Sequence, residues 1–134
     1  MEYTDATDKC DYNDLANEWN YWYKVLGQAG NALAAGTAPT KDRCGTTNPV
    51  YLAENHPTPS DGQVTLKVCM VSGNKDCFDE GSIQVINCGA FYLYKLVQIR
   101  SNCSPAPWRY CTNGETGEKS KVRYLQSQPH NSYF

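Results

Sequence analysis

The chain has 134 residues, which is enough for one compact domain and too few for two ordinary ones. Its formal net charge is −2 and its basic residues are scattered, so we expect no nucleic-acid partner. No apolar run approaches the roughly 20 residues needed to cross a bilayer, so we also expect no membrane span.

The first predicted elements are a short helical turn and a strand. We expect the turn around Asn13 to Asn17, and a strand over Trp22 to Leu26, where aromatic and β-branched residues precede Gly27. Between Gly27 and Pro49 the chain is rich in Gly, Ala, Thr and Pro, which indicates loops.

The middle of the chain predicts strands around one irregular loop. A short strand over Pro49 to Leu52 is followed by Glu54 to Gly62, where two prolines exclude a regular ladder and indicate a surface loop. Apolar and polar residues then alternate over Gln63 to Val71, as in a half-buried strand. A turn lies between Cys69 and Cys77, so a local bridge across a hairpin is geometrically easy there.

The clearest strand patterns follow, over Ser82 to Asn87 and Ala90 to Val97, and Gly89 between them favours a bulge or tight bend. Near the C-terminus, Val122 to Leu125 is one more candidate strand. We therefore predict a mainly β fold: a single disulfide-stapled, β-rich domain with a short N-terminal helical turn.

Cysteine is the most informative residue type, with seven in this small chain: Cys10, Cys44, Cys69, Cys77, Cys88, Cys103 and Cys111. This density indicates disulfides and an oxidising compartment, and so a secreted, extracellular protein. The alternative, a metal or redox centre, lacks support because no pair has C-x-x-C spacing and neither histidine has ligand spacing to a cysteine. Polar residues follow Met1 directly, so we expect a mature form without its signal peptide.

Several short sequence motifs, taken in order along the chain, resemble those of the cysteine-rich module shared by uromodulin and the related pancreatic secretory granule glycoprotein. The resemblance covers residues 10–111 of a single domain spanning 1–134, with 112–134 as an extension. Its carriers are Trp22-Tyr23, Gly27-Gln28-Ala29-Gly30, Pro49-Val50-Tyr51-Leu52, His56-Pro57, Asp61-Gly62, Cys69, Cys77, Ser82-Ile83-Gln84-Val85, Cys88-Gly89-Ala90-Phe91-Tyr92-Leu93-Tyr94-Lys95-Leu96 and Arg109-Tyr110-Cys111.

The resemblance implies three bridges, Cys10 with Cys88, Cys44 with Cys111, and Cys69 with Cys77. The family cysteine that would pair with Cys103 lies before Trp22, where this chain has none. Because Cys103 falls in a polar stretch, we expect it to join two chains in a disulfide-linked homodimer.

No residue pattern supports an enzyme. The only histidines are His56 and His130, and His56 belongs to the His-Pro word of the module, so we assign no catalytic residue. The resemblance instead implies an extracellular glycoprotein that engages microbial adhesins through attached glycans. The sequence has a single glycan acceptor pattern, Asn102-Cys103-Ser104, and whether Asn102 is glycosylated is left open.

A covalent dimer with two sites would suit a lectin, because avidity multiplies weak sugar affinity. We therefore predict a Ca²⁺-dependent lectin that prefers terminal galactose-like sugars, on the plan of small secreted invertebrate lectins such as those of sea anemones, although no lectin motif is present. The alternative is a structural or protein-binding module of an extracellular matrix or mucosal coat. A third hypothesis, that the protein is a toxin or an inhibitor, is supported only by its small size and its disulfides.

Candidate sugar and metal residues are those with oxygen ligands or an aromatic face. Glu54, Asn55 and Asp61, near Gln63, are the first choice for Ca²⁺ and sugar hydroxyls, and Asp79 and Glu80, near Asp76, are the reserve metal set. Trp108, flanked by Pro105 and Pro107, is the predicted platform for stacking on a sugar ring; the alternative is that it covers the core.

Overall fold

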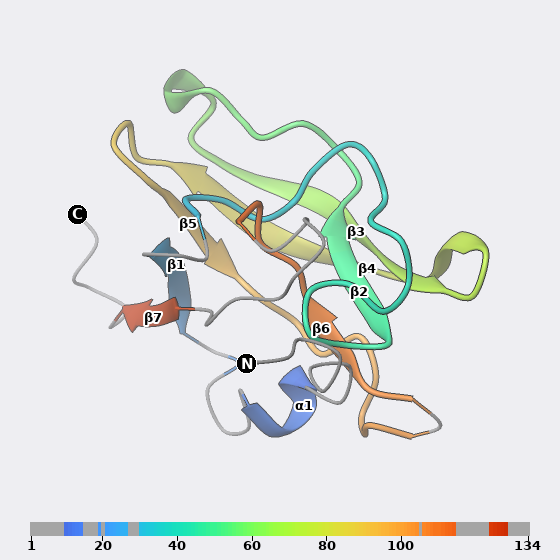
Figure 1. The fold of residues 1–134 in the computed structure, drawn as a ribbon. Helices are drawn as coiled ribbons and strands as arrows, with labels where there is room; N and C mark the ends of the chain where they lie inside the picture. The colour runs from blue at the N-terminus through green and yellow to red at the C-terminus, as the bar shows by residue number, and fades with distance from the viewer. Residues whose placement is uncertain are drawn as a thin grey trace.

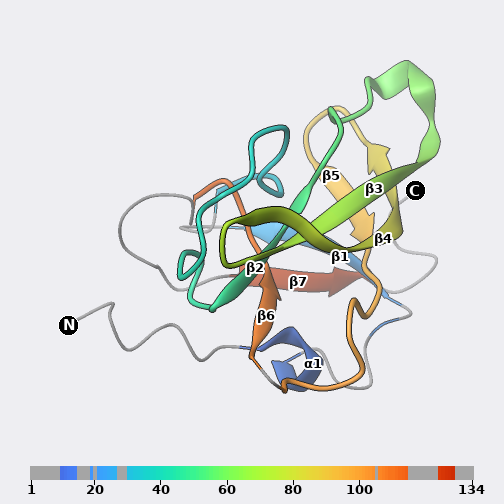
Figure 2. The same cartoon turned by 90° about the vertical axis from the view of Figure 1, so that its right-hand side faces the viewer.

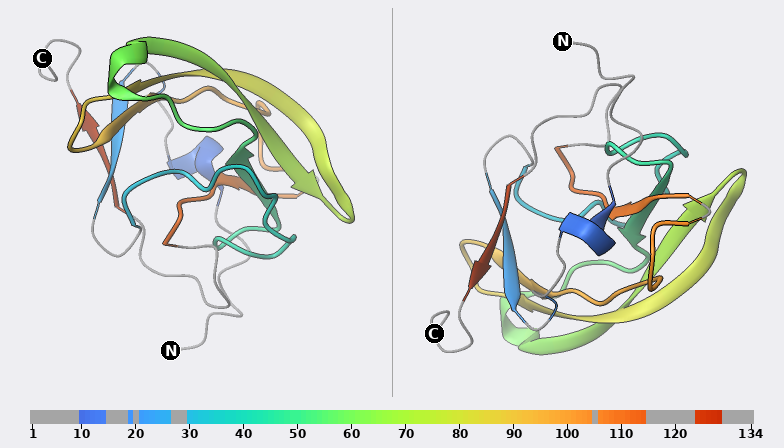
Figure 3. Two further views of the ribbon diagram at one scale, coloured as in Figure 1. Left: turned by 90° about the horizontal axis from the view of Figure 1, so that it is seen from above. Right: turned by 90° about the horizontal axis from the view of Figure 1, so that it is seen from below.

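The computed structural model describes residues 10–14, 19, 21–26, 30–104, 106–114 and 124–128, with the side chains of 13, 14, 26 and 124–128 left out. These residues form one curled sheet (Figures 1 and 3), with the short helix α1 (Asp11–Asp14) below the strands in Figure 1. The fold is thus mainly β, as predicted. In the described part of the chain, no helix combines the length and the hydropathy needed to span a membrane.

The sheet has seven strands in the order β6-β2-β3-β4-β5-β1-β7. Neighbouring strands are antiparallel except β2 and β6, which are parallel. Their bounds are β1 (Trp22–Leu26), β2 (Asn48–Leu52), β3 (Gln63–Ser72), β4 (Lys75–Asn87), β5 (Tyr92–Lys95), β6 (Trp108–Tyr110) and β7 (Tyr124–Gln128); a 3-10 turn, η3 (Pro59–Asp61), precedes β3.

The longest pairing is the hairpin of β3 and β4, which extends away from the other strands in Figures 1 and 3. Exposed and half-buried side chains alternate over the first part of β3, as the sequence predicts, with Thr65 and Lys67 exposed. From Val68 to Val71 every residue is buried. The turn at Gly73, where φ is +60°, suits glycine because it has no Cβ.

The main core lies inside the curl and takes side chains from six strands. Its fully or almost fully buried members include Tyr23, Val25, Val50, Leu52, Val68, Met70, Ile83, Val85, Tyr94, Trp108 and Tyr110. A second, smaller cluster lies on the other face of β2, and it contains Ala34, Cys44, Tyr51, Cys69, Val71 and Cys111. Every residue of β2 is therefore buried, which is the pattern of a strand covered on both faces.

The covering on the second face of β2 comes from the loop that precedes the strand. The Leu52 N–H donates to Ala34 O at 2.8 Å, and the Gly36 N–H donates to Leu52 O at 2.9 Å. The Ala34 N–H in turn donates to Cys111 O at 2.9 Å. The backbone groups of the loop are thus hydrogen-bonded to those of neighbouring segments, so the loop needs no regular structure of its own.

Several boundaries differ from the predicted ones. The helix lies at Asp11–Asp14, earlier than the predicted turn, and residues 15–17 of that turn lie outside the described residues. The strand β4 begins at Lys75 rather than Ser82, because β3 pairs with it from Lys75 to Ile86, and β5 is shorter than predicted. The last strand, β7, begins at Tyr124, near the candidate at Val122 to Leu125.

Two of the three predicted bridges are confirmed, Cys44–Cys111 and Cys69–Cys77. The third was wrong: Cys10 is bonded to Cys103, with 6.2 Å between their Cα atoms, and Cys88 is the free cysteine. The reason is spatial, because Cys88 lies at the β4–β5 turn, at the opposite end of the sheet from α1 in Figures 1 and 2. Since Cys103 is used within the chain, the predicted interchain bridge through it is also wrong.

Candidate functional site

Trp108 is not an exposed sugar platform, and that prediction was wrong. It belongs to β6, a strand that pairs with β2, and its side chain is fully buried. Its indole N–H donates to Asn102 O at 2.9 Å, and its ring stacks on Trp19 with 5.9 Å between ring centroids. The alternative reading, an aromatic side chain that closes the core, describes what the structure contains.

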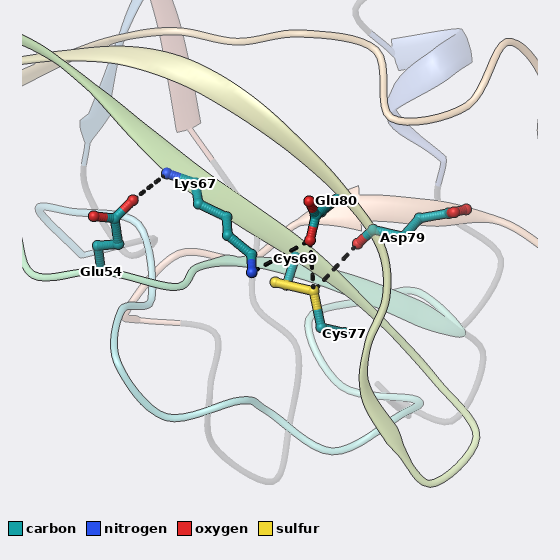
Figure 4. Close-up of polar contacts among 6 residues, drawn as sticks. All are labelled: Glu54, Lys67, Cys69, Cys77, Asp79 and Glu80. Carbon is teal, nitrogen blue, oxygen red and sulfur yellow. Dashed lines mark hydrogen bonds and ion pairs between the residues drawn. A yellow bond between two sulfur atoms is a disulfide. The ribbon is translucent and has the colours of Figure 1, made fainter.

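The two carboxylates among the predicted calcium residues of the surface loop accept backbone hydrogen bonds. The Glu54 carboxylate accepts the Lys67 backbone N–H at 2.7 Å, as Figure 4 shows, and the Asp61 carboxylate accepts the Thr58 N–H at 2.8 Å across η3. Asn55 is exposed beside Glu54. Each carboxylate keeps further lone pairs, and calcium binding by these residues stays a prediction.

The reserve pair, Asp79 and Glu80, does not converge on one point. The two residues are adjacent in β4, so their side chains leave opposite faces of the strand. Glu80 pairs with the Lys67 ammonium at 3.2 Å, whereas the Asp79 carboxylate points away from that pair in Figure 4 and accepts from Arg100 Nε at 2.8 Å. Neighbouring Asp76 is exposed in the hairpin.

Among the described His, Cys, Asp and Glu side chains, one trio has ligand atoms close enough to share a metal, and it consists of Cys69, Cys77 and Glu80. The two sulfur atoms of that trio are bonded to each other. A disulfide offers no thiolate, and the thiolate is the form of cysteine that binds metal. The trio is therefore a structural bridge beside an ion pair.

The same part of the hairpin presents an exposed aromatic ring. The side chain of Phe78 is 48% exposed, and the guanidinium of Arg100 lies over its ring at 5.4 Å from the centroid. Because Arg100 also pairs with Asp79, the position of the guanidinium is set by two neighbours. We call Phe78, Asp79 and Arg100 the Phe78 surface.

The Cys69–Cys77 disulfide braces this surface from the second face of the sheet. It closes a loop of eight residues across the β3–β4 hairpin. Cys77 Sγ lies 3.7 Å from Asp79 O and 3.9 Å from Glu80 Oε1, as Figure 4 shows. These are sulfur–oxygen contacts, since a disulfide sulfur has no proton to donate. The bridge limits how far the Phe78 surface can deform.

A histidine–tyrosine cluster was not predicted. His56 Nε2 lies 2.7 Å from the Tyr94 hydroxyl, which accepts the Leu33 N–H at 3.0 Å, and the His56 ring lies 4.3 Å from that of Tyr92. Burial lowers the pKa of His56 and raises that of Tyr94 well above its usual value. The alternation Tyr92, Leu93, Tyr94 indicates a strand, but nothing local indicates its distant partners.

The Asn102 acceptor pattern lies in an exposed turn. The Asn102 side-chain oxygen accepts the Ser104 N–H at 3.2 Å, and the side chain is exposed. The middle residue of the pattern, Cys103, is bonded to Cys10. Asn102 is therefore on the surface, and its glycosylation stays open.

Residues 23–112 match the family described as Uromodulin-like, D8C domain. The chain is 31% identical over 125 residues to the pancreatic secretory granule membrane major glycoprotein GP2 of Mus musculus, covering 87% of this chain and 23% of that protein. It is 35% identical over 98 residues to uromodulin of Mus musculus, covering 72% of this chain and 14% of that protein. The chain thus spans less than a quarter of the length of either relative.

Proposed function

The chain belongs to the uromodulin-like D8C family, and on that premise we propose that it is an extracellular, non-catalytic module that binds a partner protein through the Phe78 surface. The three disulfides support the extracellular location, because such bonds persist in oxidising compartments. The non-catalytic role is an inference from the sequence, where no catalytic pattern was found.

The exposed ring of Phe78 is the observation that carries this proposal. Of the described large apolar side chains, only Phe78 and Tyr21 are exposed. Aromatic and Arg side chains dominate binding energy in protein interfaces, and here the two are stacked on each other. The disulfide beneath them keeps the surface rigid, which lowers the entropy lost on binding.

The test is co-purification from the extracellular fluid of the source tissue, comparing the wild-type protein with Phe78→Ala. We expect a protein partner to be retained by the wild type and its affinity to fall about 30-fold in the variant, as for a hot-spot side chain worth about 2 kcal/mol. Tyr21→Ala is the matched control, because Tyr21 is similarly exposed at 43% but lies outside the hairpin.

Three results of this experiment would be decisive. Retention that resists free sugars and is lost only in Phe78→Ala supports the proposal. Equal retention by Phe78→Ala and the wild type contradicts it, as does loss in both variants, provided that circular dichroism shows both to be folded.

A second candidate function is carbohydrate binding, with the predicted calcium dependence and preference for galactose. It is supported by a pocket lined by a tryptophan together with a serine, a glutamine and a lysine. A glycan array with and without a chelator tests it. Galactosides bound only with Ca²⁺ would support the full prediction, whereas binding that persists with the chelator would separate the sugar from the metal.

A further inference from the structure

A pocket of about 270 Å³ opens beside the end of β5, and none of the predicted site residues lines it. The lining residues are Trp19, Ser82, Gln84, Lys95, Leu96 and Val97. This volume is just below the range of roughly 300 to 1,000 Å³ that is typical of small-molecule sites. The size suits a single sugar ring better than an oligosaccharide.

The pocket exists because β5 is much shorter than β4. The two strands pair only from Gln84 with Lys95 to Asn87 with Tyr92, whereas β4 continues back to Lys75. After Lys95 the chain leaves the strand, and Leu96 and Val97 line the gap together with Ser82 and Gln84. Trp19 completes the wall.

The apolar part of the wall is held by the core. Trp19 stacks on the fully buried Trp108, so its orientation does not depend on the pocket being filled. Leu96 is 1% exposed and belongs to the main core. A flat aromatic ring held in this way can cover the apolar face of a pyranose.

The polar groups of the pocket are mostly spare hydrogen-bond donors. The Lys95 ammonium has no ion pair, and the Ser82 hydroxyl no hydrogen bond, among the described residues. The Trp19 indole nitrogen is buried and is therefore not one of them. The Gln84 side-chain oxygen already accepts from Gln63 and Thr65, at 3.2 and 3.1 Å, which leaves its NH₂ group.

The charge of the lining is one-sided. The lysine side chain can donate hydrogen bonds but cannot accept them, and the lining contains no carboxylate. A neutral sugar needs acceptors for its hydroxyl protons as well as donors. A carboxylate on the sugar matches a set of donors and a free ammonium better.

We propose that this pocket binds an acidic pyranose, that is, a sugar ring bearing a carboxylate, with its ring against Trp19 and its carboxylate toward Lys95. This inference rests on the carbohydrate-binding candidate above and replaces its neutral sugar by an acidic one at a defined place. It needs no metal ion, because the ammonium supplies the positive charge.

The test is isothermal titration of the intact chain with four methyl glycosides, in the presence of a chelator. The probes are those of glucuronic acid and N-acetylneuraminic acid, the two sources of the shared chemistry, and of glucose and galactose as neutral counterparts. We expect at least one acidic glycoside to bind at least tenfold more tightly than both neutral ones. Raising the salt concentration should weaken that binding, because a charge pair at the surface is screened.

Two variants locate the site. Lys95→Met removes the ammonium and keeps a long side chain, and it should weaken binding of the acidic glycoside at least tenfold. Lys24→Met is the matched control, because Lys24 lies in the neighbouring strand β1, over the Phe91 ring, and does not line the pocket. Ser82→Ala, at an exposed position, gives a second disturbance of the pocket and should weaken binding less.

The outcomes separate the proposals. Neutral sugars bound as tightly as acidic ones, or acidic binding unchanged in Lys95→Met, overturns the acidic-pyranose inference but leaves carbohydrate binding standing. Binding of none of the four probes overturns the inference. If the glycan array is also blank, the carbohydrate-binding candidate fails too. Neither result affects the protein-binding proposal, which depends on Phe78.

Discussion

Cys10 and Cys103 are joined by a disulfide although 93 positions separate them in the chain. The bond ties the start of α1 to the loop before β6, where the Asp11 side chain also contacts β6. All seven cysteines lie in the described part of the chain, and six of them form the three bridges, so Cys88 carries the one thiol.

Peptide mapping of the unreduced protein should therefore find Cys10 linked to Cys103 and a single alkylated cysteine, Cys88. Burial raises the pKa of the Cys88 thiol, so we expect its alkylation to be slower than that of a free thiol in solution. Mass spectrometry after treatment with iodoacetamide measures both. A peptide linking Cys10 to Cys88 would contradict the structure.

Removing the Cys10–Cys103 bond with the double variant Cys10→Ser, Cys103→Ser should cost about 4.7 kcal/mol of stability in the chain-entropy treatment of a loop this long. The double variant that removes Cys69–Cys77 should cost less, about 2.5 kcal/mol, because that bond closes only eight residues. Guanidinium unfolding measures the difference. Equal losses would show that loop length does not govern these bridges.

Trp108→Ala should destabilise the fold by about 3 to 5 kcal/mol, because it leaves a cavity in a core where the wild-type side chain is fully buried. Thermal unfolding followed by circular dichroism measures this. Tyr21→Ala, at an exposed aromatic residue, is the control and should change stability by less than about 0.5 kcal/mol. A Trp108 variant as stable as the wild type would argue that the side chain is on the surface.

Asp11→Ala should strongly destabilise the fold, because Asp11 is a buried carboxylate. The Asp11 carboxylate is fully buried, accepts the Tyr110 N–H at 2.7 Å and lies 4.0 Å from Arg109 Nε. Removing it takes away the acceptor of the buried Tyr110 N–H and the negative charge beside the buried Arg109 guanidinium, at a cost of about 3 to 5 kcal/mol. Asp76→Ala, at an exposed carboxylate, should be nearly neutral in the same denaturant titration, and similar losses in the two variants would be inconsistent with this geometry.

Stability should fall as the pH is lowered from about 6.5, the ordinary pKa of histidine. Because burial lowers the pKa of His56 in the folded state, the unfolded chain binds the extra proton first, and protonation favours unfolding until the folded pKa is passed. His56→Gln should flatten this part of the curve in thermal melts between pH 7.5 and 5. An unchanged pH dependence would assign it to other groups.

The alternation in Gln63 to Val71 correctly predicted a strand, because the two-residue period of side chains is a local property. It is half-buried as predicted from Gln63 to Lys67, whereas Val68 to Val71 are buried on both faces. Local patterns also predicted the strand Trp22–Leu26 and the tight turn at Gly89, where φ is +88°. The local bridge Cys69–Cys77 could also be predicted, because its two residues lie on either side of a single turn. Local structure of this kind can be predicted because it depends mainly on the residue types of neighbouring positions.

The order of strands, the partner of Cys10 and the burial of Trp108 were decided only by the tertiary structure. Trp108 follows a proline and has no strand pattern before it, yet pairing with β2 places it in the core. The pocket at Trp19 and the contact between His56 and Tyr94 likewise join residues from distant parts of the chain. Local propensities do not determine which distant segments meet, because that choice depends on how the whole sheet curls to bury its apolar face.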